Sequence, residues 1–184
     1  MNMLKLISSL LCAFPLSIFA STIPEYPING KAGTLLMMSD AATFSVNEIY
    51  SGVAANWVGG DSVVFYQTDL PFFPAALSFQ NDLPVFEPMI YIFNVNTGTT
   101  AVGFVESPPS ISPVTIQTIN PFLGTVILSD FTTWDVRPSD QLLFSFWQIG
   151  DAVMIGENLG SDRASYDAIL LNTTHKSTAH VVEQ

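Results

Sequence analysis

Turn-forming residues interrupt this chain at short and fairly regular intervals. It contains 11 Gly and 12 Pro, and the runs between them are rich in Val, Ile, Phe, Thr and Tyr. Proline cannot sit in a central strand and glycine weakens one, while β-branched and aromatic residues favour extended backbone. Strands that recur about every 8–12 residues between turns are typical of all-β proteins. We therefore predict an antiparallel β-sandwich of about ten strands, either a jelly roll or an enlarged immunoglobulin-like fold.

The predicted strands follow from the apolar runs and their alternation. They are Thr34–Met38, Thr43–Tyr50, Ser62–Thr68, Ala75–Gln80, Met89–Val95, Ala101–Val105, Val114–Ile119, Gly124–Leu128, Gln141–Trp147, Ala152–Ile155 and Ala168–Asn172. The runs at 62–68 and 89–95 are apolar on both faces, which predicts central strands covered on both sides. Within 141–147, alternation places Leu142, Phe144 and Phe146 on one face of a strand.

One domain is expected to span residues 21–172, followed by a polar tail at 173–184. No repeat of about 20–50 residues is visible, which argues against propellers and solenoids. The tail holds both histidines, His175 and His180, without the cysteines or ordered acids that a metal site would need.

The first twenty residues have the pattern of a secretory signal peptide. Lys5 precedes an apolar run that ends at the small residue Ala20, and we expect cleavage there. The run is too short and too interrupted for a comfortable membrane span. A retained N-terminal anchor and a lipoprotein modified at Cys12 are the alternatives. We expect the protein to be secreted or periplasmic, with no membrane span after cleavage.

Charge and cysteine content exclude several classes of function. The chain has 16 acidic residues against five Lys and Arg, a formal net charge of −11. Nucleic-acid binding needs clusters of Lys and Arg, so it is not expected. The only cysteine, Cys12, lies in the leader, so the exported part would have no disulfide, thiolate metal site or Cys nucleophile.

No constellation of residues indicates catalysis. Gly59–Val63 is similar to the Gly-Asp-Ser-Leu stretch of an esterase family, but Ser177 stands where the matching Asp-x-x-His motif needs its Asp. No two carboxylates stand out as a glycosidase pair. We therefore predict a protein that is not an enzyme.

Aromatic residues beside turns are the predicted ligand-binding residues. Trp57 and Trp134 adjoin turns, and Phe72 and Phe73 lie between prolines. Flat apolar rings beside polar groups can bind sugars, so we expect at least one of the two tryptophans to be exposed.

Glu157 and Asp162 in the run ENLGSD are the predicted metal ligands, with calcium as the candidate ion, because calcium prefers oxygen ligands in tight turns. The sequence thus favours a secreted, non-catalytic β-sandwich that binds an extracellular ligand, with carbohydrate and structural calcium as candidates. The alternative is a structural or self-assembling extracellular surface protein, adhesin-like, because the chain is rich in apolar residues.

Overall fold

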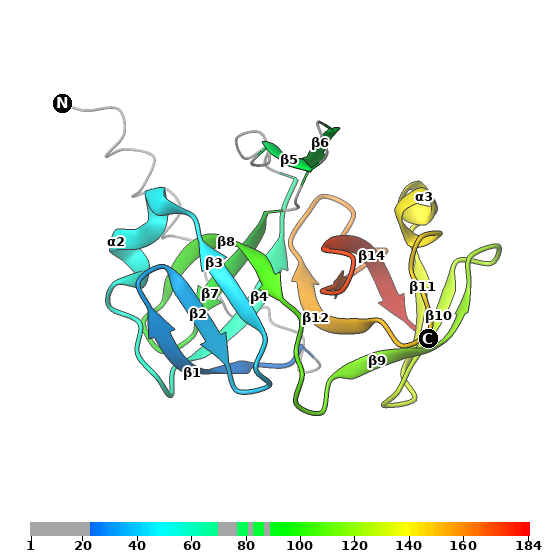
Figure 1. The fold of residues 1–184 in the computed structure, drawn as a ribbon. Coiled ribbons are helices and arrows are strands. Elements are labelled where there is room, and N and C mark those ends of the chain that lie inside the picture. The colour runs from blue at the N-terminus through cyan, green and yellow to red at the C-terminus, as the bar shows by residue number, and fades with distance from the viewer. Residues whose placement is uncertain (1–22, 70–76, 81–82, 87–88) are drawn as a thin grey trace.

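The computed structural model describes residues 23–69, 77–80, 83–86 and 89–184, and it is all-β, as predicted. Twelve strands form one continuous hydrogen-bonded sheet, in which pairings between non-adjacent strands close two circuits. Each circuit is a six-stranded antiparallel barrel, and the barrels lie side by side (Figure 1). The predicted sandwich is not confirmed, because the sheet curls back on itself instead of packing as two open layers.

The first barrel contains the N-terminal half of the described chain. Its strands are β1 (Tyr26–Ala32), β2 (Leu35–Met38), β3 (Thr43–Val46), β4 (Ser62–Gln67), β7 (Ile90–Asn94) and β8 (Thr99–Ser107). Their order around the barrel is β1-β2-β3-β8-β7-β4, and β4 pairs back with β1. A 3₁₀ turn, η2 (Glu48–Tyr50), and one helical turn, α2 (Ser51–Ala54), connect β3 to β4.

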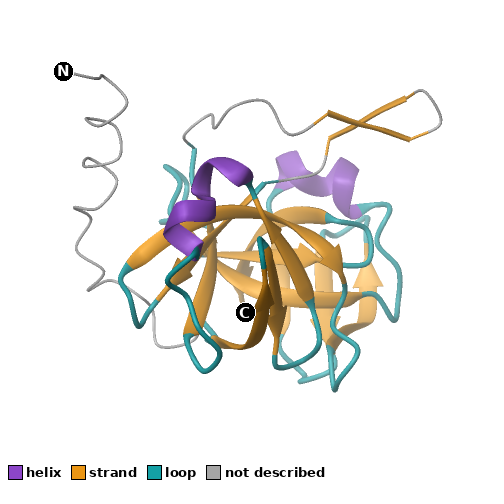
Figure 2. Ribbon diagram, turned by 60° about the vertical axis from the view of Figure 1, so that its left-hand side comes forward, coloured by secondary structure: helices purple, strands orange, loops and turns teal. Residues whose placement is uncertain are grey.

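The second barrel repeats this plan. Its elements are β9 (Val114–Asn120), β10 (Thr125–Leu128), β11 (Thr133–Val136), η3 (Pro138–Asp140), α3 (Gln141–Phe144), β12 (Ala152–Asn158), β13 (Ala168–Asn172) and β14 (Ser177–Glu183). The order is β9-β10-β11-β14-β13-β12, and β12 pairs back with β9. Between β4 and β7 the first barrel has an addition, the hairpin of β5 (Leu77–Gln80) and β6 (Leu83–Phe86), which stands clear of both barrels (Figure 2).

The two barrels are copies of one sequence pattern. Positions 38–67 align with 128–157 without a gap, so that Ser39-Asp40 matches Ser129-Asp130. The residue after each Ser-Asp pair has a left-handed backbone, with φ 66° at Ala41 and 69° at Phe131. This repeat is much longer than the 20–50 residues considered above, and equivalent positions keep their structural role more often than their residue type.

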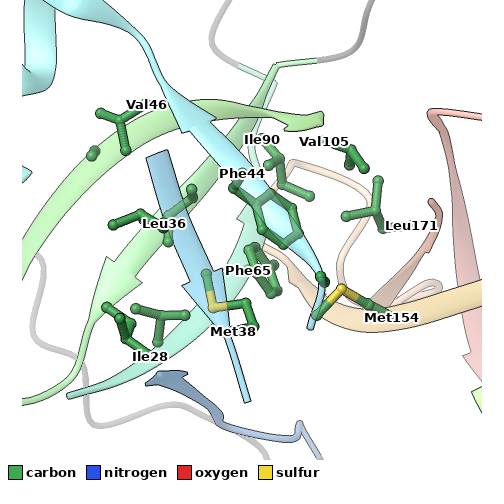
Figure 3. Close-up of a cluster of buried hydrophobic side chains, with 14 of the residues drawn as sticks. Ile28, Leu36, Met38, Phe44, Val46, Phe65, Ile90, Val105, Met154 and Leu171 are labelled. Carbon is green, nitrogen blue, oxygen red and sulfur yellow. The ribbon is translucent and has the colours of Figure 1, made fainter. Parts of the chain in front are cut away.

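Each barrel has an apolar core, a third buried cluster gathers Tyr66, Tyr91, Phe93 and Val102, and the outer face of the second barrel contributes to the first core. The first core gathers Leu36, Phe44 and Phe65 together with Met154 and Leu171 from β12 and β13 (Figure 3). Strand pairing also joins the two barrels, because β4 of the first and β12 of the second are parallel neighbours. The predicted central strands at 62–68 and 89–95 correspond to β4 and β7, whose interior positions are buried, as expected.

Two predicted segments are wrong. The stretch 141–147 is not a strand: Gln141–Phe144 form α3, and the buried side chains Phe144 and Trp147 are three apart, as on a helix. Residues 173–184 are not a polar tail, because Ser177–Glu183 form β14 between β13 and β11. The alternation of Ala179 and Val181, both buried, places this strand in the second core.

Candidate functional site

The two tryptophans predicted as ligand platforms are core residues. Trp57 is 1% exposed and Trp134 is 3% exposed, so the expectation that at least one would be accessible is wrong. Their indole nitrogens donate to Thr99 Oγ1 and Thr132 Oγ1, both at 2.8 Å. A buried indole needs such a partner, so both hydrogen bonds serve the fold. Phe72 and Phe73 lie outside the described residues.

The two predicted calcium ligands have different surroundings. Asp162 Oδ2 accepts from Arg137 Nη1 at 2.5 Å, and its Oδ1 accepts from Asn158 Nδ2 at 2.8 Å. Both carboxylate oxygens are therefore engaged by the protein. Among the described residues, no group of three or more His, Cys, Asp and Glu side chains is placed to hold a metal ion.

Glu157 is instead a buried carboxyl in the second barrel. It shares a strand face with Val153 and Ile155 of the second core, and its Oε2 has no hydrogen-bond partner among the described residues. Burial raises the pKa of Glu157 to about 7; nearby Arg163 lowers it and Asp167 raises it further. Its equivalent in the first barrel, Gln67, likewise has a buried oxygen without a partner in that part of the chain.

A charged network joins the α3 corner of the second barrel to β14. Asp140 Oδ1 accepts from Arg137 Nη2 at 2.7 Å, while Oδ2 contacts His180 Nδ1 at 2.8 Å and accepts from the His180 amide at 2.9 Å. Arg137 also holds Asp162, on the loop between β12 and β13. Burial opposes ionisation of Asp140, but the hydrogen bonds from His180 and Arg137 outweigh it and hold its pKa well below the usual range.

The contacts of this network hold the fold together at one end of the second barrel. Asp140 is contacted by Arg137 from its own corner and twice by His180, through the amide and the ring, so the His180 contacts fasten this corner to β14. His180 lies on β14, within the segment that the sequence predicts as a polar tail, so the histidine–carboxylate pair is not predicted from the sequence. The signal that could have predicted it is the alternation of the apolar Ala179 and Val181 with the polar Thr178 and His180.

An exposed apolar surface is the other prominent feature of the second barrel. We name it the apolar face. Its six residues lie on the β9–β10 turn, on α3 and on the loop after α3: Phe122, Leu123, Leu142, Leu143, Phe146 and Ile149. Phe122 is 91% exposed and Leu142 is 74% exposed.

Local geometry brings these segments to the same end of the barrel. A Cβ placed on Gly124 would lie 3.1 Å from the Gln141 side chain, so the β9–β10 turn directly adjoins the start of α3. Figure 1 shows the turn and α3 rising on the same side of the second barrel. The helical turn directs Phe144 and Trp147 inward, with their rings 5.5 Å apart, and leaves Leu142, Leu143 and Phe146 outside.

The first barrel lacks this surface at equivalent positions. Leu142, Phe146 and Ile149 correspond to Gly52, Asn56 and Gly59 in the ungapped alignment of the two copies. The β1–β2 turn consists of Gly33 and Thr34, whereas the β9–β10 turn has four residues, and the longer turn carries Phe122 and Leu123. The barrel therefore folds without large apolar residues at these places.

Comparisons of the chain with protein-family models, with curated proteins and with solved structures find no match. In the part of the chain that is described, no helix is both long enough and apolar enough to cross a membrane.

Proposed function

We propose that this chain is an exported, non-catalytic binding protein that works by docking a partner on the apolar face. The observation that carries the proposal is the exposure of six large apolar side chains at one end of the second barrel. Monomeric soluble proteins seldom expose apolar patches beyond roughly 300–600 Å², and larger ones mark interaction sites. An exposed Leu or Phe presents roughly 100–200 Å², so the six together present roughly 600–1,200 Å², at or above the upper end of that range.

The comparison between the two copies supports the same proposal. Both barrels need the buried indole, the Ser-Asp turn and the alternating core, and both have them. Only the second has Leu142, Phe146 and Ile149 where the first has Gly or Asn. Because the fold does not require them, their presence favours a role in recognition.

Export is proposed from the leader pattern of residues 1–20, and the non-catalytic role from the engagement of the polar groups. Asp140, Asp162 and the His180 ring are held by each other and by Arg137. Carbohydrate binding has lost its support, since both candidate tryptophans are buried.

Site-specific photo-crosslinking in producing cells tests the proposal. The full chain carries a benzophenone amino acid in place of Leu142 on the apolar face, or in place of Ile49, which is 80% exposed on the first barrel. Illumination should give a discrete adduct from position 142 and none from position 49. Phe146→Ser should abolish that adduct. Absence of any adduct from position 142, or equal adducts from both positions, would refute the proposed function.

A further inference from the structure

We propose that the partner on the apolar face is a second copy of this chain, which docks with its own apolar face to form a symmetric dimer. The inference rests on the proposed function, because it names the partner for the same surface. Closed two-fold dimers use one patch twice, so the patch must match itself. A face of flexible Leu and flat Phe side chains meets that condition. It carries no charge, so it can pack against its own copy without a complementary charge on the other side.

The size of the face fits such a dimer. A stable interface of standard size removes about 800 Å² from each partner, with an apolar centre and a polar rim. The six apolar residues supply most of that area on the order-of-magnitude estimate above. Gln141, Ser145 and Gln148 lie among them in the sequence and provide the uncharged polar groups of a rim.

Charge favours a second copy over other partners. The two segments that form the face, 121–124 and 141–149, contain no Asp, Glu, Lys or Arg. The chain as a whole has 16 acidic residues and a net charge of −11, so two copies repel each other wherever their carboxylates meet. An uncharged face is the surface on which like-charged copies can approach at the lowest electrostatic cost.

The same charge argues against two other partners. A basic protein would be drawn to carboxylates, which this face lacks. A cell membrane usually presents anionic lipid, which attracts Lys and Arg and repels a chain of this charge. A protein that docks on lipid through Phe and Leu would gain from basic residues beside them, and segments 121–124 and 141–149 contain none.

The test is the mass of the protein in solution as a function of concentration and salt. The full chain is expressed with its own leader, the product is weighed by mass spectrometry, and its assembly is followed by sedimentation velocity. A dimer should form as concentration rises. It should tighten from low to high NaCl, because salt screens the repulsion between acidic copies while the apolar contact remains.

Variants then place the interface. Leu142→Gln combined with Phe146→Gln should raise the dissociation constant at least about tenfold, since truncated central apolar residues typically dominate such interfaces. Ile49→Gln combined with Val58→Gln, which changes two exposed apolar residues of the first barrel, should leave it unchanged. Melting temperatures of both double variants confirm that they fold.

Four outcomes would overturn the inference. A monomer at all concentrations and salts would do so, as would equal effects of the two double variants. A monomer that co-sediments with neutral phosphatidylcholine vesicles, and loses this with the 142/146 variant, would assign the face to lipid. A crosslinked adduct from position 142 whose mass is not twice that of the chain would retain the proposed function and reject the second copy.

Discussion

Asp61 and Asp151 make the same hydrogen bonds at the same place in the two barrels. Asp61 Oδ2 accepts from Asn94 Nδ2 at 2.8 Å and from the Val58 amide at 3.0 Å. Asp151 Oδ2 accepts from Asn172 Nδ2 at 2.8 Å and from the Gln148 amide, also at 2.8 Å. Both asparagines are fully buried, so each aspartate satisfies a side-chain amide that has no access to water.

Removing either aspartate should destabilise the protein to a similar degree. Asp61→Ala and Asp151→Ala each leave a buried amide and a backbone N–H without an acceptor, at a cost of about 2–3 kcal/mol. Asp130→Ala is the control, because Asp130 is exposed and its side chain bonds only within its own turn; it should cost about 1 kcal/mol or less. Urea denaturation measures all three. Costs for Asp61→Ala and Asp151→Ala as small as that of the control would contradict the proposed equivalence.

The sequence predicted the strands better than their closure. Apolar alternation located β3, β4, β7, β12 and β13, because burial of one or both faces leaves a direct trace in the residue types. Whether a sheet closes into a barrel depends on twist and register, which composition does not record. The duplication is not evident from the sequence because the copies share few residue types, such as the Ser-Asp turns and the buried Trp57 and Trp147, and differ at most other core positions.

The exposed apolar residues on and after α3 could not be predicted from the sequence pattern either. Leu142, Phe144 and Phe146 alternate like a strand, but η3 begins at Pro138, a residue that favours the first turn of a helix, and α3 follows it. A short helical turn shows too little periodicity to compete with alternation. Placing these residues on a strand put Phe144 and Phe146 on one face, whereas the helix buries one and exposes the other.

The backbone at Phe131 predicts a stabilising substitution. Phe131 is exposed and has φ 69°, a conformation that costs a non-glycine residue about 1–2 kcal/mol. Phe131→Gly removes this strain, and after the added flexibility of the unfolded chain we expect a net gain of about 0.5–1 kcal/mol. Thermal unfolding measures it.

A matched glycine substitution controls for flexibility alone. Ala55 is exposed and has φ −55°, so Ala55→Gly should lower stability by about 0.5–1 kcal/mol. Opposite signs for the two substitutions are expected. A loss at both positions would show that the left-handed residue is not strained.

Glu157 makes stability depend on pH near neutrality. Burial raises its pKa from 4.5 to about 7 in the folded chain, so the folded state favours the protonated form more than the unfolded state does. Its contribution to stability is fully present below about pH 4.5 and is lost as pH rises through about 7. Glu157→Gln keeps a neutral side chain, so the variant should gain in melting temperature relative to the parent as pH rises from about 5 to about 8.

An exposed glutamate provides the comparison for that experiment. Glu106 lies exposed on β8, and Glu106→Gln should shift the melting curve by the same small amount at every pH. If the Glu157→Gln difference is constant between about pH 5 and about pH 8, the carboxyl is ionised freely and the buried placement is refuted.

Asp140 should act in the opposite direction, at acidic pH. Its folded-state pKa lies well below the ordinary 3.8, since hydrogen bonds from His180 and Arg137 outweigh the effect of burial. The stability that it contributes is therefore present above its unfolded pKa and is lost as pH falls through the acidic range.

Asp140→Asn keeps the shape of the side chain but weakens the contacts to Arg137 Nη2 and His180 Nδ1, so near pH 7 it should cost about 2–3 kcal/mol. Denaturant titrations near pH 7 and near pH 3 should show this cost shrinking with acidity, whereas Asp130→Asn should show little cost at either pH. A cost that grows on acidification would mean that the network is held by something other than the ionised Asp140 carboxylate.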